Sequence, residues 1–393
     1  MSLNFFNSDF ILREKRYSWI DYDKGISIIL VAYGHCLTLL GSSQIGLENW
    51  PVFRYVGLFL YGFRMPLFFI ISGVFLAGSL SRKGLGGYIY GRSNNVLYPL
   101  VVWGFLEVGL HVLSDYHKTH VFHWEGFLNL FVHPRAVGIG QFWYLNALFS
   151  IGVIYAILKV KLKLGLIPQL VLGLAFYCVS AYWHVNDIEM GMLTDILAFY
   201  IWFSLGAAIS TIVLDEKNVR RFASLKIFFP LAVIFICLQY YCTSINLAFG
   251  HGDADFVENK KPFLYLIEAL TGCILSVNIS FQLQKHKIVR FLRVVGFHSL
   301  FIYVMQIVVM TIVDTVLIKV FKVRYVPVVV ILLWVSGVII PIFIYNMCLR
   351  FNMWWLFTFI KPEKEIAAIR GKKAPVAGSK PQLVGDLDIQ PRN

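Results

Sequence analysis

The sequence predicts an all-α, polytopic membrane protein of about ten transmembrane helices with both termini in the cytoplasm. Of its 393 residues, 58% are hydrophobic and only 15% are charged, which is more apolar surface than a soluble fold can bury. Apolar stretches long enough to cross a hydrocarbon core of roughly 30 Å recur along most of the chain. The bilayer is therefore expected to be the main solvent, and one membrane domain is expected over residues 19–350.

Each predicted span is an apolar run that ends at polar or basic residues. The runs lie at residues 24–41, 55–79, 95–113, 141–158, 164–183, 193–214, 226–244, 262–283, 296–318 and 326–350. Between the third and fourth spans, residues 117–141 mix histidines and aromatic residues with polar ones. This segment is expected to form an interfacial helix or a re-entrant loop.

Lys and Arg residues gather in alternate loops, which sets the predicted orientation. The richer loops are those at 13–16, 82–92, 159–163, 217–226 and 285–293, together with the C-terminal tail. The positive-inside rule then places the N-terminal segment 1–18 and the tail 351–393 in the cytoplasm, as an even number of spans requires. We expect a multi-pass protein of the bacterial inner membrane, with a basic tail that is disordered because its composition cannot bury a core.

The charge and the cysteines exclude several classes of protein. The formal net charge of +13 is explained by orientation in the membrane, so no nucleic-acid partner is predicted, although an anionic cofactor could use the same charges. The six cysteines lie in or beside apolar runs without a CxxC pair and are expected to be small core residues. Loop histidines match no ligand spacing, so no metal is predicted. The N-terminus shows no cleavable signal peptide.

The first span carries Asp21, Lys24 and His35, which are costly residues inside a bilayer. Lys24 and His35 are eleven positions apart, which places them on one helical face about 16 Å apart along the axis. Asp21 lies close to the same stripe. A neutral imidazole in this position can take a proton from a hydroxyl. The alternative is a histidine that is hydrogen-bonded between helices, with Lys24 extending to the interface, and the spacing leaves both interpretations open.

The second span contains Arg64, Pro66 and Gly73 within one apolar run. Pro66 and Gly73 are expected to mark a packing kink. Arg64 must find a carbonyl, a carboxylate or a bound anion in this environment. A carboxylate partner, either Glu107 or Glu268, is as good an expectation for it as a ligand.

Several motifs together resemble the membrane acyltransferase-3 family over roughly residues 17–350. They are Ile20–Ile26 with Gly34–His35, Phe63–Gly73, Arg92 with Leu97–Pro99, Phe142–Leu145 and Ser299–Tyr303. The residues around Trp19 and Lys24–Gly25 are similar to the fucose 4-O-acetylase-like branch, which acetylates sugar hydroxyls. The chain departs from that branch at Arg64 and at Gln306, where the branch often has histidine.

The resemblance implies an O-acetyltransferase that moves an acetyl group from acetyl-CoA to a hydroxyl of a cell-surface or secreted saccharide or glycolipid. His35 would be the general base, with Asp21 and Lys24 orienting the polar stripe beneath it. Arg64 and Arg92 would hold donor phosphates or stabilise developing negative charge. Trp143 and Ser72 would complete the donor and substrate contacts, although a packing role is equally expected for Trp143.

Two other classes of function remain open on sequence grounds. A carrier or flippase for a polysaccharide precursor or a small anionic solute would line its path with Arg64, Glu107 and Glu268, and His35 would relay protons. A structural membrane subunit of a polysaccharide export complex would need none of these residues for chemistry.

Overall fold

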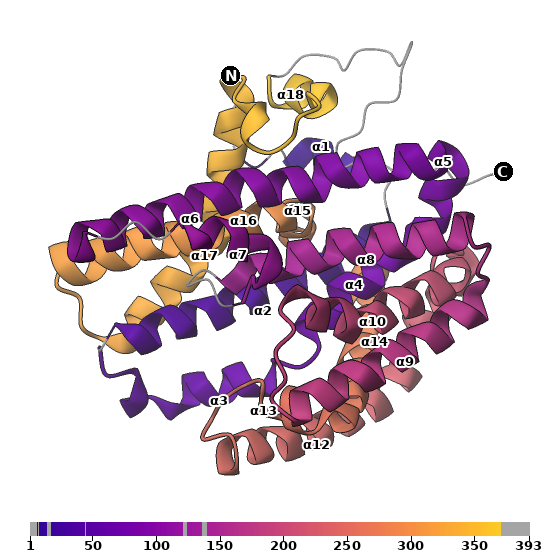
Figure 1. The fold of residues 1–393 in the computed structure, drawn as a ribbon, viewed down its shortest axis with the longest axis horizontal. Helices are drawn as coiled ribbons and strands as arrows, with labels where there is room; N and C mark the ends of the chain where they lie inside the picture. Colours follow the sequence, from indigo (N-terminus) through magenta and orange to yellow (C-terminus); the bar gives the residue numbers. More distant parts are fainter. Residues whose placement is uncertain are drawn as a thin grey trace. The chain divides into compact units, whose positions relative to one another are not determined.

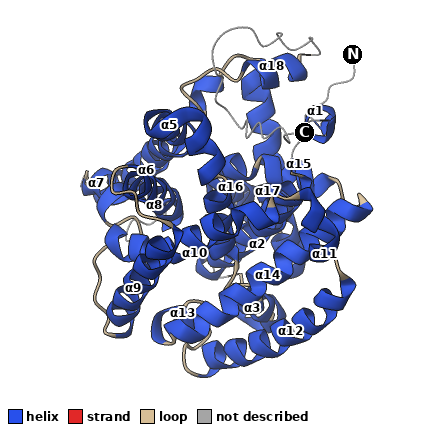
Figure 2. Cartoon of the chain, turned by 90° about the vertical axis from the view of Figure 1, so that its right-hand side faces the viewer, coloured by secondary structure: helices blue, strands red, loops and turns tan. Residues whose placement is uncertain are grey.

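The computed structural model describes residues 6, 8–13, 17–43, 45–120, 124–135 and 140–370, and in this part of the chain all regular structure is helical (Figures 1 and 2). Ten segments of the described residues are long and apolar enough to cross a membrane. They are residues 18–42, 51–74, 76–114, 140–160, 166–185, 192–213, 225–248, 262–286, 299–320 and 326–350. The predicted all-α class and number of spans are confirmed.

Two spans differ from their predicted form. The second is not one kinked helix but two helices, α3 (Pro51–Phe59) and α4 (Arg64–Val74), separated by a break at residues 60–63. Pro66 lies in the first turn of α4, where its missing N–H leaves no intrahelical bond unmade, so it starts a helix rather than bending one. The third span begins at Leu76, because the Gly- and Lys-containing stretch that reads as a loop is helical apart from Gly84.

The chain divides into two compact units, each described here separately. Unit 1 comprises Met1–Phe68 and Val213–Met347, and unit 2 comprises Phe69–Ile212 and Cys348–Asn393. The helices of unit 1 are α1 (Ser8–Arg13), α2 (Ser18–Ser42), α3, the start of α4, α11 (Val219–Phe222), α12 (Leu225–Ala248), α13 (Phe256–Lys260), α14 (Pro262–His286), α15 (Phe291–Phe297), α16 (Ser299–Thr315) and most of α17 (Val326–Arg350).

In unit 1, the long helix α2 packs against α14, α15 and α16. Its contact with α15 is close because both helices present glycine there. A Cβ on Gly296 would lie 2.7 Å from the backbone carbon of Asp21, and a Cβ on Gly25 would lie 3.1 Å from that of Leu292. The side chain of Asp21 then pairs with Arg293 of α15 across 3.8 Å. The N-terminal half of α2 is therefore packed closely on α15 and paired with it.

Unit 2 contains the end of α4 and a second set of helices. These are α5 (Leu76–Arg92), α6 (Tyr98–Thr119), α7 (Glu125–Val132), α8 (Trp143–Val160), α9 (Leu166–Val185), α10 (Met192–Val213) and the short α18 (Glu363–Ile369). A π-helical turn at Ser93–Leu97 joins α5 to α6. Helices α4 and α10 meet backbone to backbone, because a Cβ on Gly73 would lie 2.9 Å from the amide nitrogen of Ala207.

The expected disordered tail carries structure over its first part. Trp103 donates a hydrogen bond to the carbonyl of Leu356 at 3.0 Å, and the amide of Ile360 donates to Asn94 at 2.9 Å. Phe357 is fully buried, so these residues pack on unit 2 through an aromatic side chain that the basic composition of the tail conceals. The rest of the predicted tail, residues 371–393, lies outside the described residues.

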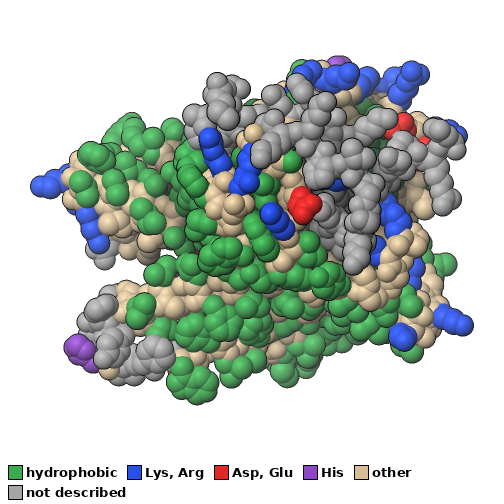
Figure 3. All heavy atoms as spheres, turned by 90° about the horizontal axis from the view of Figure 1, so that it is seen from above, with side chains coloured by type: hydrophobic (Ala, Val, Ile, Leu, Met, Phe, Trp, Pro, Cys, Tyr) green, Lys and Arg blue, Asp and Glu red, His purple; other side chains and the backbone are tan. Residues whose placement is uncertain are grey.

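The outer surfaces of the helices match a lipid environment. On α12, Phe229, Val233 and Ile236 are exposed, whereas Gln239 and Thr243 are buried. This inversion of the soluble pattern is typical of a helix that faces lipid with its apolar side and keeps its polar side chains inside the protein. The face in Figure 3 is largely hydrophobic, and most of its Lys and Arg side chains lie toward the edges. The protein is a multi-pass membrane protein.

Candidate functional site

His35 lies in the second half of α2 with its side chain half-buried. Its ring makes no hydrogen bond to any residue that the structure describes, so it is not the interhelical hydrogen-bonded histidine that the sequence left open. Because α2 is continuous from Ser18 to Ser42, the predicted separation of about 16 Å between Lys24 and His35 along the axis holds. Neither ring nitrogen of His35 is engaged in a hydrogen bond with the described part of the chain.

The break between α3 and α4 brings the Arg64 side chain onto α2. Nη1 of Arg64 donates to the carbonyl of Leu30 at 2.7 Å, and Nε donates to the carbonyl of Tyr61 at 3.2 Å. The Ser27 hydroxyl donates to the carbonyl of Arg64 at 2.7 Å, which ties the start of α4 to the same helix. Of the partners that the sequence left open for Arg64, the structure shows backbone carbonyls, and not the carboxylate of Glu107 or Glu268.

Gly34 allows the guanidinium group to lie beside His35. A Cβ at Gly34 would be 2.5 Å from Nη1 of Arg64, so any other residue at this position would displace the side chain. Nη2 of Arg64 has no hydrogen-bond partner among the described residues. The guanidinium of Arg64, with one free donor, thus lies against the residue that precedes His35 in α2.

Asp21 and Lys24 do not contact this pair. Asp21 is buried in its ion pair with Arg293, about 21 Å along the helix axis from His35. Lys24 is half-buried one turn further along. We infer that Asp21 positions α2 on α15, and that its influence on His35 acts through the backbone of the helix.

The sequence analysis did not single out Asp23, although it is fully buried. Its Oδ1 accepts hydrogen bonds from Ser276 at 2.5 Å and from Ser280 at 3.0 Å, both on α14. The sequence does contain a feature that could have identified Asp23, because it is an acidic residue inside a span, as Asp21 is. Asp23 lies off the stripe of Asp21, Lys24 and His35, and spacing along the helix gives no sign that it faces α14.

Arg92, Trp143 and Ser72 belong to unit 2. Nη2 of Arg92 donates to the carbonyl of Leu148 at 2.8 Å, and its guanidinium lies 5.9 Å from the ring of Phe203. Ser72 is half-buried on α4, next to the glycine that packs on α10. Trp143 lies at the start of α8, with its ring 5.0 Å from that of Phe199 on α10. The three candidates therefore surround one stretch of α10.

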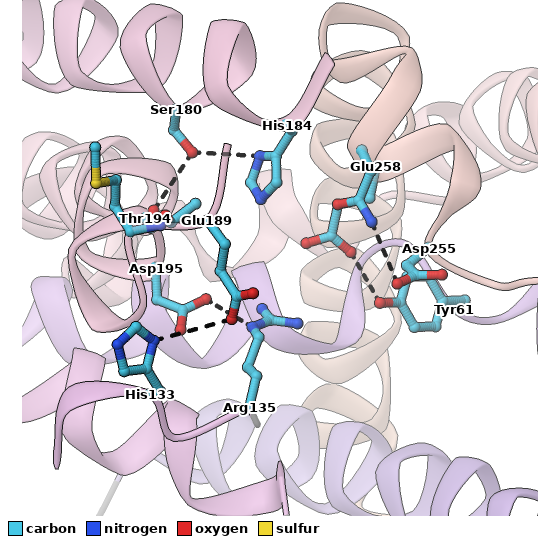
Figure 4. Close-up of polar contacts among 12 residues, drawn as sticks. Tyr61, His133, Arg135, Ser180, His184, Glu189, Thr194, Asp195, Asp255 and Glu258 are labelled. Carbon is cyan, nitrogen blue, oxygen red and sulfur yellow. Dashed lines mark hydrogen bonds and ion pairs between the residues drawn. The ribbon is translucent and has the colours of Figure 1, made fainter. Parts of the chain in front are cut away.

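Trp143 is also covered by Arg135, a residue that the sequence analysis did not select. The guanidinium lies 4.0 Å from the centroid of the tryptophan ring. Its Nε donates to Asp195 at 2.8 Å, as Figure 4 shows. Asp195 is buried, and its Oδ2 has no partner among the described residues. This cation–π contact and ion pair fix the tryptophan ring in place.

Two further acids in the spans, Glu107 and Glu268, have separate partners. The side-chain amide of Gln141 donates to both carboxylate oxygens of Glu107, at 2.9 and 2.8 Å, within unit 2. In unit 1, Glu268 lies against Gly62 in the break, beside Gln239 and Cys242 of α12. In the part of the chain that the structure describes, no group of three or more His, Cys, Asp or Glu side chains could hold a metal ion.

The comparisons with known proteins agree with the motifs. The family model of the acyltransferase domain matches residues 17–349. The chain is 25% identical to nodulation protein NolL of Sinorhizobium fredii over 55% of each chain. It is 24% identical to nodulation protein NolL of Mesorhizobium japonicum over 73% of this chain and 74% of the relative. The match thus spans about half the length of the first relative and about three quarters of the second. No solved structure matches the chain.

Proposed function

Because the chain belongs to the acyltransferase domain family and is an O-acyltransferase, we propose that it transfers an acetyl group from acetyl-CoA to a hydroxyl of a cell-surface or secreted saccharide. The family match supports acyl transfer, and the sugar-directed motifs of the first span support the acceptor class. The acceptor could be a free glycan or a glycolipid, since both present hydroxyls at a membrane surface. We place the protein in a bacterial inner membrane.

The observation that carries the proposal is the position of the Arg64 guanidinium against Gly34, the residue before His35, whose imidazole has no hydrogen-bond partner among the described residues. His35 takes the proton of the acceptor hydroxyl as its oxygen attacks the thioester carbonyl. Nη2 of Arg64 stabilises the negative charge that develops on the carbonyl oxygen. When the C–S bond breaks, the imidazolium returns the proton to the leaving CoA thiolate, so the products are an acetyl ester and free CoA.

Within unit 2, we propose that Arg92 binds phosphate oxygens of the donor and that Trp143 and Ser72 line the same region. Two features support this role. The guanidinium of Arg92 donates to the Leu148 carbonyl through Nη2 only, and its buried Nε has no partner among the described residues. Arginine also suits phosphate because its planar fork matches two oxygens.

The test is acetylation by the purified full-length protein in lipid nanodiscs. Radiolabelled acetyl-CoA is supplied with a panel of saccharides, and transfer of label to the sugar is measured by chromatography and mass spectrometry. We expect label on a saccharide hydroxyl with release of CoA in equal amount. CoA release without labelled sugar would contradict the acceptor class. No CoA-dependent acetylation, with saccharide or anion transport in vesicles instead, would favour the carrier.

A further inference from the structure

A second group of buried polar residues lies in unit 1 next to the break between α3 and α4. We call it the acidic column and define it as Glu258, Tyr61 and Glu268. Glu258 belongs to the short helix α13, in the segment that connects α12 to α14. The Tyr61 hydroxyl donates to Oε2 of Glu258 at 2.8 Å (Figure 4). The column thus begins at a loop outside the spans and enters the membrane region at the break.

Tyr61 also connects the acidic column to Arg64, the residue proposed to act together with His35. The Arg64 guanidinium lies 4.9 Å from the centroid of the Tyr61 ring, in addition to its bond to the Tyr61 carbonyl. One residue therefore contacts Glu258 at its hydroxyl end and Arg64 at its backbone end. Tyr61 therefore bridges Glu258 in the α12–α14 loop and the guanidinium of Arg64.

Glu268 forms the other side of the column. Its side chain is 3% exposed, and its Cδ would lie 2.7 Å from a Cβ on Gly62, so the carboxylate occupies the space that this glycine leaves at the break. On α12, Gln239 lies beside it, and Thr243 follows one turn later on the same buried face. The Thr243 hydroxyl is 1% exposed and has no partner among the described residues.

These groups have the chemistry of a site for a polyhydroxylated ligand. A buried hydroxyl without a partner costs about 1–3 kcal/mol, a cost that a ligand removes by hydrogen bonding to it. Carboxylates are strong acceptors for hydroxyl donors, and such charge-assisted bonds are roughly twice as strong as neutral ones. Two carboxylates in a low-dielectric region also repel an anionic ligand.

We propose that the acidic column binds the hydroxyls of the acyl acceptor and selects uncharged or cationic saccharides over those that carry carboxylate or phosphate groups. This inference rests on the proposed function, since it assigns the acceptor side of the same reaction. The acceptor enters from the α12–α14 loop, which the predicted topology places outside the cytoplasm. Its reacting hydroxyl then reaches His35 past Arg64.

The experiment compares wild-type protein with Glu258→Gln and Glu268→Gln in the acetylation assay. The acceptors are methyl glycosides of glucose, galactose and mannose, each paired with its uronic acid, which differs only at C6. For the wild type, kcat/KM is expected to favour the neutral member of a pair by about tenfold or more. Each variant should raise KM for the neutral acceptor by about tenfold, with KM for acetyl-CoA unchanged, and should narrow the preference over the uronic acid.

Glu48→Gln serves as the matched control, because Glu48 is an exposed carboxylate in the loop between α2 and α3. Tyr61→Phe gives a second route if a glutamate variant fails to fold, since it removes only one hydroxyl and should also raise the acceptor KM. An unchanged acceptor KM in all folded variants, or a wild-type preference for uronic acids, would overturn the inference and leave the proposed function standing. Absence of acetylation of every saccharide by the wild type would overturn both.

Discussion

At the scale of single residues, the candidate chemistry depends on a glycine next to a histidine. Gly34 leaves the space in which Arg64 lies, and Arg64 supplies a donor beside His35. The same guanidinium is anchored at two carbonyls, so it needs no reorganisation when charge develops on a substrate. Preorganisation of this kind is usually the largest single contribution of an active site to rate.

Gly34→Ala is expected to lower kcat about 10- to 100-fold, because the new methyl group would lie 2.5 Å from Nη1 of Arg64 and would displace it. Gly41→Ala is the matched control on the same helix, since a Cβ there meets nothing within 4 Å. Initial rates at saturating acetyl-CoA measure both variants. Equal rates for Gly34→Ala and Gly41→Ala would show that the guanidinium position does not matter.

The stripe of Asp21, Lys24 and His35 was predictable at this scale because helical spacing is local. The neighbour of His35 was not predictable, because Arg64 reaches it across a break in a different span. Asp21 lies on the predicted stripe, but its side chain pairs with Arg293 of α15. It cannot touch the imidazole, because Asp21 and His35 are about 21 Å apart along the helix axis. Helical spacing therefore identified the face of α2 on which these polar residues lie. Which of them have common neighbours depends on tertiary packing, which the spacing cannot predict.

At the scale of elements, the broken second span is the main departure from the sequence prediction. The apolar run is continuous through residues 60–63, so hydropathy gives no sign of the interruption. Backbone groups freed inside a membrane must be satisfied by protein. The hydrogen bonds of Arg64 and Ser27 at this break do so, and they join α4 to α2. The break is thus the element that places the guanidinium.

Helix α2 holds its position through close packing on α15, which leads to a stability prediction. Gly296→Ala should lower the unfolding free energy by about 1–3 kcal/mol, because its Cβ would lie 2.7 Å from the backbone of Asp21. Gly78→Ala, in a helix with nothing within 4 Å of its Cβ, should be neutral or slightly stabilising. Thermal unfolding in detergent, followed by circular dichroism, compares the two. A melting temperature for Gly296→Ala at or above that of Gly78→Ala would contradict this packing.

At the scale of the whole molecule, composition and apolar run length were sufficient to predict ten spans, because the bilayer imposes a length on each helix. The sequence did not predict which segments of the chain form each of the two units. Unit 1 takes residues from both ends of the membrane domain, and unit 2 takes the middle together with the segment after Met347. The aromatic residues that fold this last segment onto unit 2 are few among many charged ones, so its average composition was misleading.

The orientation of the chain in the membrane remains a prediction with a direct test. In a background without the native cysteines, Asp187→Cys should react with a membrane-impermeant maleimide in intact cells. Lys161→Cys should react only after the membrane is opened. Both side chains are exposed in short loops, at opposite ends of α9 (Leu166–Val185), so they differ only in the side of the membrane. Labelling in the reverse order would place both termini outside the cytoplasm.

The central claim, that His35 is the base of an acyl transfer, is tested most directly by His35→Ala in the acetylation assay. Loss of a general base should lower kcat about 100- to 10,000-fold. Acetyl-CoA binding and melting temperature should be unchanged, since the His35 ring makes no hydrogen bond to the described protein. His111→Ala, which alters an exposed histidine of α6, should retain the wild-type rate. Saccharide acetylation by His35→Ala at a rate within a fewfold of the wild type would contradict the account.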